Sequence, residues 1–526
     1  MKSTLKTLTA WLLFLTLFTT ILPCTVLAAD TPYEISTAEE LWHFARRVNA
    51  GQSDLDAILI ADIVFNENVL NENGALTSGD FDSWEPIGTD WETAYSGTFD
   101  GNDKTISGLY FHDEWTSYVG LFGYIKDGTV KNVHIKDSYF YGDAFIGGLV
   151  GCVESGLVID CSSSATVESG SDYVGGIAGA NMPTDGATAT IKNCSYTGTI
   201  TAGGSYVGGV VGFNSATSGG TAIVEHCYNA GKKVHGYGTI GGVVGLNCAT
   251  YETSSATVTN CYNTGWVDSY DNLAGGIVGM NKADQDSPKA TIENCYNTGK
   301  LTVRSEIAGG IVGENNAWFN SATASIKNCF NIGAIPAYDN CGGIAGINNR
   351  FYDSATASIT NCYYLDDNRF VLGGINGSDE PGFAEAKKTE QFASGEVAYL
   401  LGVPFGQNLD NGFPVQAFPV LSEERVYHYL EGYSNHPYGF VVLDESYQNL
   451  TVHVDEAGTY SVIFAHYDAD GVLQELCVAP LVASQEGDFP VSRTASMTFG
   501  VGDSIMLWSN TITCKPLCNG YTIPKE

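Results

Sequence analysis

The chain has 526 residues and a formal net charge of −35, because 59 acidic side chains outnumber 24 basic ones. This excess of negative charge repels nucleic acid and anionic lipid, so neither is an expected partner. Hydrophobic residues make up 44% of the chain and 62 residues are glycine, which excludes the disordered class, and the length allows two or three domains.

Residues 1–29 are predicted to be a signal peptide. Lys2 and Lys6 precede a short apolar run, and small residues follow at Ala28 and Ala29. This order of charge, apolar core and small-residue exit is typical of secretion signals, and the run is too short for a membrane span. We therefore expect a secreted, extracellular protein, either released or associated with the cell surface, with no membrane span in the mature chain.

Residues 30–60 are expected to form an N-terminal cap with one short helix and a first strand. Ser36 and Glu39 have the spacing of a capping box, and Gly51 ends the apolar stripe that follows. The stripe consists of Leu41, Phe44, Ala45 and Val48. A helix of this kind can cover the open edge of a stack of strands, so Trp42 and His43 are interpreted as cap residues and not as ligands.

Residues 61–370 are dominated by a repeat of about 33 residues, in which a Gly-Gly-apolar-small-Gly block recurs. Blocks with the regular spacing begin at Gly175, Gly208, Gly241, Gly275, Gly309 and Gly342. An asparagine follows each of these blocks, at Asn181, Asn214, Asn247, Asn281, Asn315 and Asn348. A second block carries a cysteine, at Cys161, Cys194, Cys227, Cys261, Cys295, Cys329 and Cys362, and five of these cysteines precede a tyrosine or phenylalanine.

Each repeat offers three short apolar segments between turn-forming residues, and none is long enough for a helix. One repeat cannot bury its apolar face alone, but stacked repeats make a continuous core. The sequence therefore predicts an all-β protein whose main body is a parallel β-solenoid, or β-helix. We expect three strands in each repeat and roughly nine coils spaced about 4.8 Å apart.

The recurring residues then become ladders along the solenoid. Stacked asparagines can pass amide hydrogen bonds from coil to coil, and the Gly-Gly pairs suit tight turns or close approach. The cysteines are expected to be buried free thiols, because side chains on neighbouring coils run parallel and suit a disulfide poorly. Cys152, Cys248 and Cys341 fall outside the series, and their pairing with ladder members stays open.

The repeat blocks resemble a known family. Tyr173-Val174-Gly175-Gly176-Ile177-Ala178-Gly179 and Asn294-Cys295-Tyr296-Asn297-Thr298-Gly299 look like the GLUG motif. That motif occurs in bacterial surface and secreted proteins, including the N-terminal parts of zinc metallopeptidases that cleave immunoglobulin A. The resemblance implies an extracellular repeat module. It implies no reaction, because no histidine here begins a His-Glu-x-x-His zinc signature.

Residues 371–432 are predicted to be a C-terminal cap and linker, with a helix over 389–401 and an irregular strap over 406–419. Residues 433–526 alternate like strands and predict a small antiparallel β-sandwich. This segment resembles the immunoglobulin-like domains of multidomain exoproteins, on the match Ile505-Met506-Leu507-Trp508-Ser509 with Lys515-Pro516-Leu517-Cys518. Asp468 and Asp470 could bind calcium, but a hairpin turn needs such residues anyway. A bridge between Cys514 and Cys518 stays open.

No cofactor other than calcium is expected, and enzymatic activity is not favoured, because acidic residues in the solenoid do not recur in register. The preferred hypothesis is an adhesin-like binding protein that recognises an extracellular glycan or a host protein. Trp318 and Phe319, with Asn315, are the candidate ligand-binding residues, in a loop that interrupts the repeat. The alternatives are a structural spacer that displays the C-terminal domain and a β-helix polysaccharide lyase or hydrolase.

Overall fold

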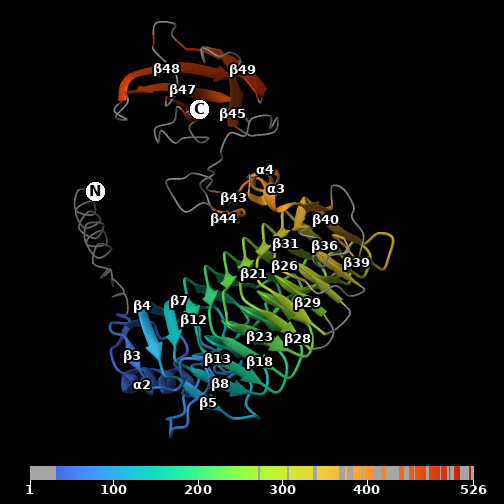
Figure 1. Ribbon diagram of the computed structural model, residues 1–526. Helices are drawn as coiled ribbons and strands as arrows, with labels where there is room; N and C mark the ends of the chain where they lie inside the picture. Colours follow the sequence, from blue (N-terminus) through green and yellow to red (C-terminus); the bar gives the residue numbers. More distant parts are fainter. Residues whose placement is uncertain are drawn as a thin grey trace, which may run out of the picture.

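The computed structural model (Figure 1) shows a parallel β-solenoid and, further along the chain, two small antiparallel sheets. It describes residues 31–270, 273–304, 307–335, 340–366, 373–375, 383–393, 395–407, 416–421, 438–442, 449–454, 457–468, 473–485, 487–493, 497, 503–509 and 521–522. The predicted signal peptide, Asp470, Cys514 and Cys518 lie outside these residues. The expected solenoid class is confirmed.

One coil contains five short strands, not the three that the sequence predicts. The coil of Tyr173 runs through β14 (Val174–Gly175), β15 (Ala178–Asn181), β16 (Thr188–Lys192), β17 (Ser195–Tyr196) and β18 (Thr199–Ala202). The Gly-Gly block bends between its two halves, so it supplies β14 and β15. Asn193, with a φ of 52°, bends the chain between β16 and β17. Two of the three expected strands thus divide at a corner, and the third remains one strand, β18.

Equivalent strands of successive coils pair in parallel and form four sheets. Sheet I, with eight strands, comprises β6 (Phe122–Ile125), β10 (Val150–Val153), β15, β20 (Val211–Thr217), β25 (Val244–Thr250), β30 (Val278–Asp284), β35 (Val312–Ala317) and β39 (Ala345–Arg350). Sheet II comprises β9 (Ile146–Gly147), β14, β19 (Val207–Gly208), β24 (Ile240–Gly241), β29 (Leu273–Gly275), β34 (Ile307–Gly309) and β38 (Cys341–Gly342). Sheet III comprises β5 (Tyr110–His112), β8 (Tyr139–Gly142), β13 (Thr166–Ser169), β18, β23 (Lys233–Gly236), β28 (Val267–Ser269) and β33 (Leu301–Val303).

Sheet IV is longer because it includes both strands beside the cysteine corner and extends to both ends of the solenoid. It comprises β1 (Tyr33–Ile35), β2 (Ala57–Leu59), β3 (Ile63–Val64), β4 (Thr98–Ser107), β7 (Gly128–Lys136), β11 (Gly156–Ile159), β12 (Ser162–Ser163), β16, β17, β21 (Thr221–Glu225), β22 (Tyr228–Asn229), β26 (Ser255–Thr259), β27 (Tyr262–Asn263), β31 (Lys289–Glu293), β32 (Tyr296–Asn297), β36 (Thr323–Lys327), β37 (Phe330–Asn331), β40 (Thr356–Thr360), β41 (Cys362–Leu365) and β42 (Ala384–Lys387). The eight strands of sheet I give eight coils there, one fewer than expected.

The asparagines after the Gly-Gly blocks point into the core and form a hydrogen-bonded ladder. Asn181 donates from Nδ2 to Oδ1 of Asn214 at 2.7 Å, and the same bond links Asn214 to Asn247 at 2.7 Å. The ladder continues through Asn281 and Asn315 to Asn348 at 2.7 to 2.8 Å. Each of these hydrogen bonds compensates a buried side-chain amide for the hydrogen bonds to water that it loses on folding. The row therefore satisfies its polar groups inside the core.

A second asparagine ladder, which was not predicted, lies two residues after the cysteines. Asn229, Asn263, Asn297 and Asn331 are buried and joined by Nδ2 to Oδ1 bonds of 2.8 Å. Cys-Tyr-Asn and Cys-Phe-Asn triplets were the signal that could have revealed it.

The seven ladder cysteines are buried and form no disulfide, and the same holds for Cys152 and Cys248. Neighbouring cysteines of the ladder contact each other without a covalent bond. For example, the backbone N–H of Cys194 donates to Sγ of Cys227, with 3.4 Å between nitrogen and sulfur. Burial raises the pKa of Cys227 well above its ordinary value and the pKa of Cys152 to about 12. These thiols therefore behave as small apolar core residues.

Helix α2 (Ala38–Asn49) covers the N-terminal coils, and its four stripe residues are fully buried. The expected capping register is one residue too early. Thr37 is the N-cap and accepts from the backbone N–H of Glu40 at 3.2 Å, while the Glu40 carboxylate accepts from Ser36. Thr37 and Glu40 replace Ser36 and Glu39 because the helix begins at Ala38.

The C-terminal cap also differs from its prediction. The single expected helix is two, α3 (Thr389–Ala393) and α4 (Glu396–Leu401), and a short hairpin of β43 (Phe405–Gly406) and β44 (Val420–Leu421) follows. Gly395, with a φ of +86°, separates the helices. They pack against aromatic side chains on the outer face of sheet IV. They do not close the C-terminal end of the solenoid, where β42 pairs with β41 and extends the sheet (Figure 1).

The C-terminal residues form two antiparallel sheets that share one apolar cluster. One contains β45 (Tyr438–Val442), β46 (Asn449–Val454) and β49 (Gly487–Ser492), and the other contains β47 (Gly458–Tyr467), β48 (Leu473–Ala483), β50 (Ser504–Ser509) and β51 (Tyr521–Thr522). Val452 from the first sheet and Phe464 from the second belong to that cluster.

Candidate ligand-binding surfaces

Trp318 and Phe319 do not stand in an interruption of the repeat. They follow β35, and the next coil continues in register with Phe351 and Tyr352 in the equivalent places. Trp318 packs against Phe351 with ring centroids 4.4 Å apart, and Phe319 stacks on Tyr352 at 5.3 Å. The second pair was not among the predicted ligand-binding residues, although an Asn-Asn dipeptide precedes both pairs closely in the sequence.

We call Trp318, Phe319, Phe351 and Tyr352 the four-ring cluster. Phe351 is 55% exposed, Tyr352 48% and Trp318 37%, so each coil-to-coil stack still presents ring surface to solvent. The ammonium group of Lys282 lies 5.1 Å from the Trp318 ring centroid. A rigid group of exposed rings offers apolar contact area at little cost in side-chain entropy, as binding hot spots do.

Asn315, the third predicted ligand-binding residue, does not reach this surface. It is fully buried in the ladder, where its Nδ2 group donates to Asn348 and to the carbonyl oxygen of Ala324. The other predicted ladder residues are buried too, except Asn348 at the end of its row, which is half-buried. The prediction for Asn315 is therefore corrected: the residue is structural.

Two further rows of stacked aromatic rings run along the solenoid. In sheet IV, Tyr228, Tyr262, Tyr296 and Phe330 stack almost parallel at 4.8 to 5.0 Å. At the sheet II corner, a second row contains Tyr118, Phe145, Tyr173 and Tyr206 at 4.5 to 5.5 Å. In both rows most ring faces are covered by neighbouring rings. A ligand therefore meets ring edges and hydroxyls there, which suits stacking on sugars less well than the four-ring cluster does.

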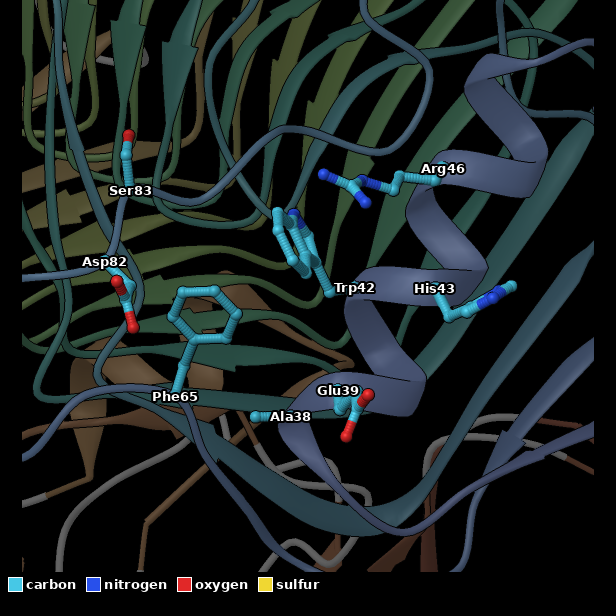
Figure 2. A pocket seen from close by; sticks show the side chains of 8 residues that line it. All are labelled: Ala38, Glu39, Trp42, His43, Arg46, Phe65, Asp82 and Ser83. Atoms are coloured by element: carbon cyan, nitrogen blue, oxygen red, sulfur yellow. The ribbon is translucent and has the colours of Figure 1, made fainter.

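A pocket of about 550 Å³ lies where α2 meets the loops before β4. Figure 2 shows Trp42 and Arg46 extending from α2 toward the segments that carry Phe65, Asp82 and Ser83. The guanidinium carbon of Arg46 lies 3.7 Å from the Trp42 ring centroid, and His43 points away from Trp42. Trp42 thus belongs to the helix that caps the solenoid and also lines a pocket with both polar and apolar side chains.

Acidic side chains on the outside of sheet IV are matched by lysines on adjacent coils. Asp100 pairs with Lys131 at 3.0 Å, and Glu225 pairs with Lys192 at 2.6 Å. Burial raises the pKa of Glu314, which accepts a hydrogen bond from Asn316. In the register of sheet I, Glu314 lies between Met280 and Ile347, so no carboxylate occupies the equivalent position on either neighbouring coil.

Within the described ranges, no group of three or more His, Cys, Asp or Glu side chains is placed to hold a metal ion. Asp468, one half of the calcium candidate, accepts a hydrogen bond from Gln474 at 2.5 Å, and the other half lies outside those ranges. No helix in the described part of the chain is long and apolar enough to cross a membrane.

No family model matches the chain. A stretch of 152 residues, 29% of the chain, is 30% identical to a segment of halomucin from Haloquadratum walsbyi, and the match spans only 2% of that protein. Among solved structures, a Bacteroides ovatus protein provisionally named an immunoglobulin A1 protease aligns with 76% of this chain and 94% of its own. The identity is 18% and the TM-score is 0.35, so this likeness carries no argument about function.

Proposed function

We propose that the protein is a secreted or cell-surface-associated binding protein, adhesin-like in role, that recognises an extracellular glycan or a host protein. The signal-like N-terminus and the resemblance of the repeats to the GLUG motif support an extracellular place. The likeness to halomucin, a mucin by its name, agrees with it. The C-terminal sheets resemble an immunoglobulin-like domain, a module common in multidomain exoproteins.

The four-ring cluster is the observation that carries this proposal. Three of its rings are exposed and Phe319 is half-buried, and two adjacent coils hold the rings in register just after the asparagine ladder. A solenoid coil changes shape little on binding, so the rings are preorganised and little entropy is lost when a partner docks. Aromatic faces fixed in this way suit the apolar faces of sugar rings or an apolar side chain of a partner.

The test is an array of neutral glycans and mucin glycoproteins probed with the protein lacking residues 1–29. We expect selective binding that falls at least about tenfold in the double variant Trp318→Ala/Phe351→Ala, because two ring contacts of a hot spot are lost. Trp115→Ala is the matched control, since Trp115 is 82% exposed and lies far along the chain from the cluster.

Binding that is equal in the wild type, the double variant and the control would remove the four-ring cluster from the account. Silence of well-folded wild-type protein on the array would favour the spacer alternative. Cleavage of a glycan on the array would instead favour the lyase or hydrolase alternative.

A further inference from the structure

The outer side of sheet III carries a group of basic and aromatic side chains on three successive strands, β23, β28 and β33. Lys233, Trp266 and Lys300 form the first outward row. Each lies one position before the first residue in which the three strands share a register. His235, Asp268 and Thr302 are in register in the next outward row. Tyr237, Tyr270 and Arg304 follow in a third outward row. We call these nine residues the cationic face; two of the strands that carry it, β23 and β28, are labelled on the solenoid in Figure 1.

Aromatic rings position the cations of this face. The ammonium groups of Lys233 and Lys300 lie 4.9 and 5.5 Å from the Trp266 ring centroid. The guanidinium of Arg304 lies 4.9 Å from the Tyr270 ring centroid. Cation–π contacts of this kind orient a charged group but leave its N–H donors unused.

The charges on the face are not balanced. Asp268 is nearly buried and accepts Lys233 at 2.7 Å and His235 at 3.1 Å, so its carboxylate is already engaged. Lys300 and Arg304 are exposed, and neither has a carboxylate partner within the part of the chain that the structure describes. In a chain with a net charge of −35, two exposed cations that are held by rings and have no acidic partner among the described residues mark a local site for an anion.

The spacing of these cations favours a polymer over a single small anion. Lys300 and Arg304 are four residues apart on one extended strand, a Cα separation of about 13 Å. Between them, the hydroxyl of Thr302 accepts from Nε1 of Trp266 at 2.9 Å, and the exposed ring of Tyr270 lies beside the Arg304 guanidinium. Such a row of cations with interleaved hydroxyls and rings matches a chain of sugars that carries an anionic group at intervals.

We propose that the cationic face binds a linear acidic polysaccharide, through carboxylate or sulfate groups that contact Lys300 and Arg304. This is a second site, separate from the four-ring cluster, and it shares with the proposed function only an extracellular glycan as ligand. Nucleic acid is the competing polyanion, but the strongly negative charge of the whole chain opposes a long phosphate backbone.

The experiment measures binding of the protein lacking residues 1–29 to immobilised polygalacturonate, dextran sulfate, neutral dextran and single-stranded DNA. We expect binding to at least one acidic polysaccharide, none to neutral dextran, and weakening with added salt. The double variant Lys300→Gln/Arg304→Gln should bind the acidic polymer at least about tenfold more weakly, since two charge-assisted contacts are lost. The stronger of the two acidic arms identifies carboxylate or sulfate as the ligand group.

The matched control is Lys136→Gln/Lys289→Gln, which removes two positive charges from exposed positions of sheet IV. An equal loss in this control would mean that only net charge matters, and would overturn the site. Absence of binding to both acidic polymers, or DNA binding as strong as dextran sulfate binding, would also overturn it. Trp318→Ala/Phe351→Ala should leave this binding unchanged, so failure here and failure of the four-ring cluster are distinguishable.

Discussion

At the residue scale, the second residue of each regularly spaced Gly-Gly pair must be glycine because an asparagine or tyrosine side chain from the opposite wall fills the space of a Cβ atom. A Cβ atom on Gly276 would lie 2.1 Å from the carbonyl oxygen of Gly310 and 2.5 Å from Cγ of Asn297. In the coil of Gly176, the ring of Tyr196 takes the place of the asparagine. A clash with backbone on the next coil cannot be relieved by a rotamer change, so glycine is required there.

Gly276→Val should therefore disrupt its coil. We expect a destabilisation of about 3 kcal/mol or more and a melting temperature lower by at least roughly 5 °C, followed by circular dichroism. Gly170→Val is the matched control, because a Cβ there meets nothing closer than the Tyr141 hydroxyl at 4.0 Å. Equal melting curves for the two variants would contradict this account of the glycines.

The stacking of residues that recur at a fixed spacing could be predicted from the sequence. The contacts that residues make with the opposite wall of the coil could not. The first asparagine row and the cysteines stand at regular intervals, and regular intervals are what stacked coils require. Asn315 lies in the predicted ladder, and its additional assignment as a ligand-binding residue was wrong because only the aromatic residues that follow it, such as Trp318, reach the surface. A β-strand alternates its two faces, so nearness in sequence says little about a shared surface.

At the element scale, the sequence predicts the stacked architecture but not where each strand ends. Asparagine and aspartate in left-handed conformation precede most of the ladder cysteines, as at Asn193 and Asp160, and these single residues divide one apolar segment into two strands. The four-sheet cross-section follows from these corners. Their φ angles become evident only when the coils are stacked, so a three-strand coil was the natural expectation.

The C-terminal cap shows the same limit. Its apolar residues predict helical packing but not the surface on which the helices pack. Phe392 lies against Phe330 with ring centroids 5.7 Å apart, and Lys387 is held by Glu396 and Glu385 at 3.0 Å each. The cap thus covers the far half of the sheet IV aromatic row, and leaves Tyr228 and Tyr262 partly exposed.

Phe392→Ala should loosen this cap without unfolding the solenoid. The side chain is 2% exposed, so its truncation removes about 3–5 kcal/mol of local packing. We expect faster tryptic cleavage after Lys387 and Lys388 while the far-ultraviolet spectrum stays unchanged. Phe383→Ala, at a residue 46% exposed, should leave cleavage at the wild-type rate. No change of rate in Phe392→Ala would argue that the helices are anchored elsewhere.

At the scale of the whole molecule, the interior of the solenoid is occupied by structural ladders, and its chemistry lies on the outside. The asparagine and cysteine rows are buried, while the four-ring cluster and the cationic face are exposed on sheets I and III. Rigid coils present both groups as fixed arrays, which suits recognition of extended ligands. The two C-terminal sheets are the competing place for a binding function.

Hydrogen–deuterium exchange of the whole protein, with and without a mucin glycoprotein that it binds on the array, tests the central claim most directly. The account predicts slower exchange on binding in the segments that carry the four-ring cluster, residues 316–320 and 349–354, with little change between residues 438 and 522. Protection confined to residues 438–522, with the solenoid segments unchanged, would contradict it and would make the solenoid a spacer for the C-terminal sheets.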